Sequence, residues 1–139
     1  MLELGSTFRN MDVGLLILRI SIGLMMLLHG IAKISHGVDG IAGMLEGFGL
    51  PGWIAFGVYM GEVVAPLLMM LGFRTRLASG VFLVNMLVIL LIAHGSQLFS
   101  LSPMGGWVLE LQGLYFFGAL ALFFTGGGKY ALSSKNSWD

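Results

Sequence analysis

Seven polar or ionisable side chains stand inside long apolar runs of this sequence or at their ends. They are Arg19, His29, Lys33, Glu62, Asn85, His94 and Glu110. A charged side chain at the centre of a membrane-spanning helix costs roughly 2.5–3.5 kcal/mol on insertion scales. Such side chains are therefore expected to face other protein segments or water rather than lipid, and we treat all seven as candidates for ligand binding.

The first apolar run places three of these residues on one side of a helix. At about 100° per residue, Lys33 lies about 40° from Arg19 and His29 about 80°. At about 1.5 Å per residue, Arg19 lies roughly 9 Å inside one membrane edge and Glu62 roughly 15 Å from the same edge. We predict an Arg19–Glu62 ion pair with Asn85 hydrogen-bonded to it, because each charge offsets the field of the other.

Three interpretations of this pair stay open at this point. It could be a structural clamp between the first two runs, or it could line a ligand cavity. The third interpretation is that Glu62 is protonated and neutral, as desolvation favours.

A second polar group is expected at the opposite membrane edge. Its members are His29, Lys33, His94 and Glu110, with Trp53 and Trp107 nearby in depth. These side chains could hydrogen-bond a quinone head group or relay protons to it. Two imidazoles and a carboxylate can also bind a metal, but these residues come from three separate runs without motif spacing, so we assign no metal site. The alternative is interfacial anchoring by a snorkelling lysine and a belt of tryptophans.

The composition identifies the class of protein that must position these residues. Of 139 residues, 57% are hydrophobic and 10% charged, with a mean hydropathy of +0.93. Soluble domains carry about 25% charged residues, so we predict an all-α integral membrane protein. The net charge of zero gives no sign of nucleic-acid binding. Because the chain has no cysteine, we expect no iron–sulfur or thiolate metal site, and we expect no haem.

Four runs have the length and hydropathy of membrane spans, so we predict a four-transmembrane-helix bundle formed by a single domain over residues 1–139. The spans are approximately residues 13–34, 53–72, 77–95 and 106–126. Between the first two, residues 35–52 favour a short interfacial helix or an ordered loop. We expect the first run to be retained rather than cleaved as a signal peptide, because it is long and contains Arg19.

The basic residues predict an orientation. Four spans put both termini on one side, which also holds most of the lysines and arginines: Arg9, Arg74, Arg76, Lys129 and Lys135. By the positive-inside rule, both termini are cytoplasmic, in a bacterial-type cytoplasmic (inner) membrane.

Three segments of this sequence resemble the DoxX family of small membrane proteins. They are LRISIGLMMLLHGIAKI, GEVVAPLLMMLGFRTRLASGVF and LELQGLYFFGALALFFTGGGKYAL. The resemblance extends from Leu15 to Leu132, and the family's polar positions match Arg19, His29, Lys33, Glu62 and Glu110. It implies a four-helix membrane bundle associated with redox systems, including subunits of quinone-linked sulfur-oxidising complexes and membrane partners of oxidoreductases.

We therefore expect a membrane subunit that binds quinone or a similar lipid-like ligand in its polar cluster and docks an oxidoreductase. It would not be catalytic alone, since the chemistry would belong to the bound molecule and the partner. Beyond membrane lipid and this redox partner, a homo-oligomer stays open. The alternatives are a non-catalytic membrane anchor or assembly factor and, third, a small oligomeric transporter.

Overall fold

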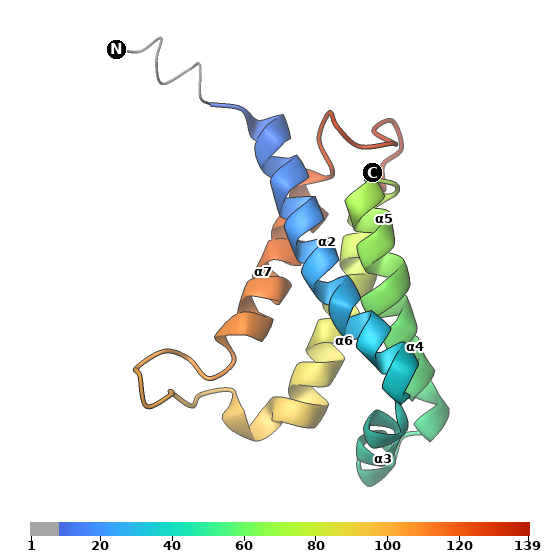
Figure 1. Cartoon of the computed structure of the whole chain (residues 1–139), viewed down its shortest axis with the longest axis vertical. Coiled ribbons are helices and arrows are strands. Elements are labelled where there is room, and N and C mark those ends of the chain that lie inside the picture. The colour runs from blue at the N-terminus through green and yellow to red at the C-terminus, as the bar shows by residue number, and fades with distance from the viewer. Residues whose placement is uncertain (1–8) are drawn as a thin grey trace.

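The computed structural model describes residues 9–139, and within that range the chain is helical with no β-strand. Helix α2 runs over Met11–His36 (Figure 1). The Asn10 side chain caps it by accepting a hydrogen bond from the Val13 backbone N–H at 3.1 Å. The helix ends at Gly37, whose φ of 82° favours glycine.

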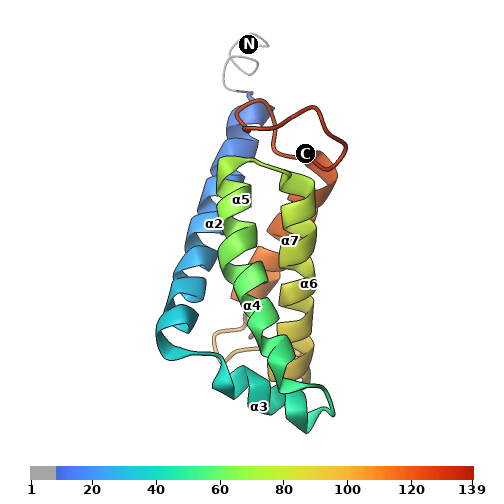
Figure 2. The ribbon, with the colours of Figure 1, turned by 90° about the vertical axis from the view of Figure 1, so that its right-hand side faces the viewer.

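A short helix then connects the first two spans. Helix α3, Asp39–Gly47, packs its buried Leu45 together with Val38 and Ala55. Of the two forms predicted for residues 35–52, a short helix or an ordered loop, the structure has the helix. Figure 2 shows α3 lying across the end of the bundle opposite the start of α2 and the C-terminus.

The second span is one helical stretch with a π-helical turn inside it. It comprises a 3-10 turn η1 (Gly52–Phe56), α4 (Gly57–Tyr59), a π-helix η2 (Met60–Val64) and α5 (Ala65–Leu71). Pro66 has no N–H, so in a regular α-helix the Glu62 carbonyl would lack its donor. The turn that carries Glu62 is π-helical, and the Ala65 N–H donates to the Met60 carbonyl five residues back.

The remaining helices are α6 (Thr75–His94), a short 3-10 turn η3 (Gly95–Gln97) and α7 (Glu110–Thr125). Three helical stretches are long and apolar enough to cross a membrane: Met11–His36, Gly52–Leu71 and Thr75–Gln97. Their bounds agree with the first three predicted spans within two residues. Helix α7 has 16 residues, about 24 Å, against a hydrocarbon core of about 30 Å. Helix α7 begins at Glu110, later than the predicted span 106–126.

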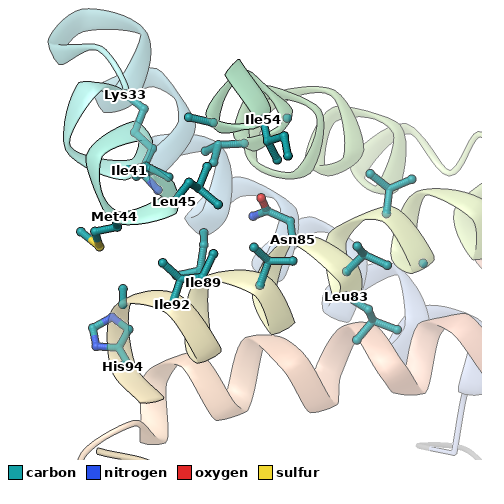
Figure 3. A pocket seen from close by; sticks show the side chains of 18 of the residues that line it. Lys33, Ile41, Met44, Leu45, Ile54, Leu83, Asn85, Ile89, Ile92 and His94 are labelled. Atoms are coloured by element: carbon teal, nitrogen blue, oxygen red, sulfur yellow. The ribbon is translucent and has the colours of Figure 1, made fainter. Parts of the chain in front are cut away.

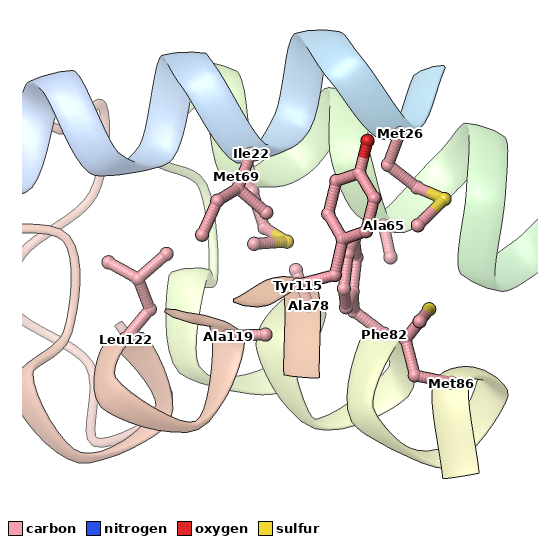
Figure 4. Packing of buried hydrophobic residues seen from close by; sticks show 10 residues of the cluster. All are labelled: Ile22, Met26, Ala65, Met69, Ala78, Phe82, Met86, Tyr115, Ala119 and Leu122. Carbon is pink, nitrogen blue, oxygen red and sulfur yellow. The ribbon is translucent and has the colours of Figure 1, made fainter. Parts of the chain in front are cut away.

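The main core lies where α2, α5, α6 and α7 meet. Figure 4 shows its buried side chains: Ile22, Met26, Ala65, Met69, Ala78, Phe82, Met86, Tyr115, Ala119 and Leu122. Glycines let α2 approach the second span closely. A Cβ on Gly30 would lie 2.2 Å from the Glu62 carbonyl oxygen, so no larger residue fits without moving backbone.

Candidate functional site

The buried carboxylate of Glu62 is held by Lys33 across the contact between α2 and the π-helical turn. Lys33 Nζ lies 2.5 Å from Glu62 Oε2, and the side chains are 28% and 3% exposed, respectively. Tyr59, one residue before the π-helical turn, donates its hydroxyl to the Lys33 backbone carbonyl at 3.2 Å. The π-helical turn thus places a nearly inaccessible carboxylate against an ammonium group that keeps some access to its surroundings.

The predicted Arg19–Glu62 pair is wrong, and helix register explains why. Arg19 lies opposite Met69 and Met70, whose carbonyls it binds. Glu62 stands seven residues before Met69, about 10 Å away along a helix. It therefore meets Lys33, farther along α2.

Arg19 is fully buried and binds backbone carbonyls. Its Nε donates to Gly127 at 3.0 Å, and its terminal nitrogens donate to Met69 and Met70 at 3.2 Å and to Tyr130 at 2.9 Å. These acceptors come from the end of α5 and from the segment that follows α7. The guanidinium group therefore joins three parts of the chain and uses four of its five N–H donors structurally.

Residues 126–139, which follow α7, fold back over the end of the bundle that holds Arg19, and we call this segment the cap. Asp139 pairs with Arg74 at 3.0 Å and accepts hydrogen bonds from the Ser133 hydroxyl and the Asn136 N–H. Burial alone would raise the pKa of Asp139, but the hydrogen bonds from Ser133, Asn136 and Arg74 and the Arg74 charge lower it to about 2. The glycine run at 126–128 indicated a helix end, but no sequence signal indicated this docking.

An elongated cavity of about 870 Å³ lies along α6 (Figure 3). It extends from Leu77 to His94, about 25 Å along the helix. Three of the seven candidate residues line it: Lys33, Asn85 and His94. Its other lining residues are almost all apolar and include Ile41, Met44 and Leu45 of α3, Ile54 of η1, and Leu83, Ile89 and Ile92 of α6.

Asn85 lines this cavity near the middle of α6. In Figure 3 its side chain rises from α6 toward the helical stretch that holds Ile54. Its Nδ2 atom is buried and has no hydrogen-bond partner among the described residues. A Cβ on Gly61 would lie 2.2 Å from Asn85 Cβ, so the glycine of the π-helical turn makes room for this side chain. A buried donor without a partner gains free energy when an acceptor binds it, because leaving it unpaired is unfavourable.

The hydrogen bonds of the described residues do not unite the predicted outer polar group. His29 packs edge-on against the Tyr115 ring, with centroids 6.2 Å apart. His94 Nδ1 lies 3.0 Å from Gln97 Oε1. Glu110 is exposed in the first turn of α7. Between residues 9 and 139, no three histidine, aspartate or glutamate side chains are grouped in a way that could hold a metal ion.

With this geometry established, comparison with known proteins assigns the family. The sequence profile of DoxX matches residues 14–95, which are more than half of the chain and include α3 to α6 and α2 from its fourth residue on. The chain belongs to the DoxX family. The DoxX match thus includes the Lys33–Glu62 pair, Asn85 and His94, and it confirms the family resemblance over residues 14–95, whereas the resemblance of the closing segment with Glu110 stays a prediction.

A distant relative has a name that points to redox chemistry. A Bacillus subtilis (strain 168) protein named "Putative oxidoreductase CatD" is 25% identical over 79 residues, which are 57% of this chain and 58% of that protein. The chain thus matches little more than half the length of this relative. No solved structure matches the chain.

Proposed function

We propose that this DoxX protein is the membrane subunit of a redox system and binds a quinone, or a similar lipid-like ligand, in the cavity along α6. The proposal is carried by Asn85, which lines a mostly apolar cavity together with Lys33 and His94 and whose buried Nδ2 has no hydrogen-bond partner among the described residues. Family membership and the oxidoreductase name of the relative support a redox role.

The cavity suits a molecule with an acceptor-bearing head and a long apolar tail. Its volume of about 870 Å³ falls within the range of about 300–1,000 Å³ usual for small-molecule sites. Asn85 and Lys33 supply N–H donors for carbonyl oxygens, while the apolar wall of α6 can accept an isoprenoid chain. Glu62 contacts Lys33 from η2 and does not itself line the cavity, so its role is to position the ammonium group.

The residues of this chain bind and orient such a ligand, and a quinone supplies electron and proton transfer when bound. The chain has no cysteine to hold an iron–sulfur cluster. We propose that a docked oxidoreductase partner contributes the second redox centre.

We also propose that α7 completes a fourth crossing, so that both ends of the chain are cytoplasmic in an inner membrane. The bundle supports this orientation, because Arg74 and Arg76 stand at the start of α6, Lys129 and Lys135 follow α7, and the Lys129 N–H donates to Asp12 in the first turn of α2. Asp39 and Glu46 on α3 lie at the opposite end. This is the asymmetry that the positive-inside rule describes.

Mass spectrometry of small molecules extracted from gently purified protein tests the ligand proposal. We expect about one quinone per protomer in the wild type and at least about tenfold less in Glu62→Gln, which loses the charge-assisted bond to Lys33. Glu46→Gln is the matched control, because Glu46 is an exposed carboxylate on α3 and should leave occupancy unchanged. Wild-type protein that retains phospholipid but no quinone would favour the membrane-anchor alternative.

A further inference from the structure

The loop between η3 and α7, residues 98–109, has an unusual surface for a connecting segment. It contains no aspartate, glutamate, lysine, arginine or histidine. Phe99 is 98% exposed and Met104 97%, and Leu101 is also well exposed. Figure 1 shows the loop projecting sideways from the bundle beside the first turn of α7. Large apolar side chains directed away from the protein are typical of a surface that meets lipid or a partner.

The backbone of this loop is hydrogen-bonded within the loop. Leu101 and Trp107 form an antiparallel bridge, Ser102 N–H donates to Gly106, and Val108 N–H donates to Ser100. The Trp107 indole N–H donates to the Leu98 carbonyl at 2.9 Å. Internal pairing of this kind is what a segment needs near hydrocarbon, where water cannot satisfy backbone groups.

The length of α7 supplies a second, independent argument. Its 16 residues span about 24 Å, so it falls short of the hydrocarbon thickness by about 6 Å. If its cytoplasmic end is level with the ends of α5 and α6, its first residues lie below the outer membrane surface. The loop that precedes it then begins within the outer edge of the hydrocarbon core and reaches the head groups, where tryptophan is enriched.

We propose that loop 98–109 is a membrane-embedded wedge whose Phe99 and Met104 side chains insert into the outer leaflet of the bilayer. The occupant of this surface is lipid rather than water or a partner protein. The inference does not depend on a ligand in the α6 cavity, so either proposal can fail without the other.

Because the chain has no cysteine, single-cysteine variants allow a direct measurement of depth. Spin labels would be attached at Phe99→Cys and Met104→Cys in proteoliposomes of phosphatidylethanolamine and phosphatidylglycerol. Their accessibility to oxygen, which partitions into lipid, would be compared with that to a water-soluble nickel chelate. Leu114→Cys on the exposed face of α7 is the lipid reference, and Ser134→Cys in the exposed cap is the water reference.

We expect the ratio of oxygen to nickel accessibility at Phe99 and Met104 to lie well above that at Ser134 and toward that at Leu114. Labels as accessible to nickel as the Ser134 label would overturn the proposal. Labels shielded from both reagents would also overturn it, because they would show that protein covers the loop. Circular dichroism of each labelled variant confirms that it retains the helical content of the wild type.

Discussion

Lys33 and Glu62 come from two different helices, and their side chains meet at 2.5 Å beside an apolar cavity. The glutamate is almost fully buried, and the lysine is about one-quarter exposed. The contact depends on the π-helical turn that carries Glu62 and on Gly30, which lets α2 approach its carbonyl. A deviation from regular helix geometry therefore positions the carboxylate that holds Lys33 at the proposed ligand site.

A double-mutant cycle tests the pair. Lys33→Met leaves a buried carboxylate without its partner and should destabilise the fold by about 3 kcal/mol, because uncompensated buried charge is costly. Adding Glu62→Gln should recover a large part of this loss, since both charges are then absent. Unfolding in detergent micelles measures each variant. Strictly additive effects of the two substitutions would show that the pair is not energetically coupled.

The contact between α2 and the π-helical turn predicts a strong effect of one added methyl group. Gly30→Ala places a Cβ against the Glu62 carbonyl oxygen, and overpacking of this kind costs about 1–3 kcal/mol. Gly14→Ala on the same helix has no neighbour within 4 Å and should be neutral or slightly stabilising. Thermal unfolding compares the two. Equal melting temperatures for both variants would contradict the close approach.

Arg19 should be irreplaceable by lysine. An ammonium group cannot reach carbonyls of α5 and of the cap together as the planar guanidinium does. Arg19→Lys should lower stability by about 2 kcal/mol, comparable to the loss of one or two charged hydrogen bonds. It should also loosen the segment after α7 and so speed tryptic cleavage at its exposed Lys129 and Lys135. Arg9→Lys, at an exposed position, is the control, and cleavage no faster than in this control would argue against a carbonyl clamp.

The cap predicts a specific response to acid. The pKa of Asp139 is lowered to about 2 from its ordinary 3.8, so the folded cap favours the carboxylate form. This contribution is fully present above about pH 4 and is lost as the pH falls toward 2. In a variant that keeps Trp138 and has phenylalanine at the other two tryptophans, fluorescence should change over that interval. Asp139→Asn should abolish the transition. If this variant still shows a transition with the same midpoint, the transition arises from another group.

The hydropathy of the chain predicted the membrane class and three long helices, because a membrane span is specified by apolar length. The start of α7 was less predictable. Trp107 and Gly106 are compatible with a helix by hydropathy, yet loop hydrogen bonds hold them outside it. The π-helical turn was not predicted, and the close approach of Gly30 to it is a tertiary contact that hydropathy does not mark.

The pairing of charges was only partly predictable. Lys33, Glu62 and Asn85 were all identified as candidates, and the structure brings them to one region. The partners of Arg19 were not foreseen, because every residue carries a carbonyl and the sequence does not mark which ones a guanidinium group will bind. Matching opposite charges by depth also assumed that helices start level, whereas α2 extends past the end of α5.

The cavity along α6 is the proposed ligand site. The most direct test is photo-crosslinking with an azido-quinone in proteoliposomes, followed by peptide mapping. We predict adducts on α6 between residues 80 and 94 and on α3, with competition by unlabelled quinone and loss in Asn85→Leu. Adducts spread over exposed α2 residues such as Ile17, Leu24 and Leu28, without competition, would mean that quinone meets this protein only as bulk lipid.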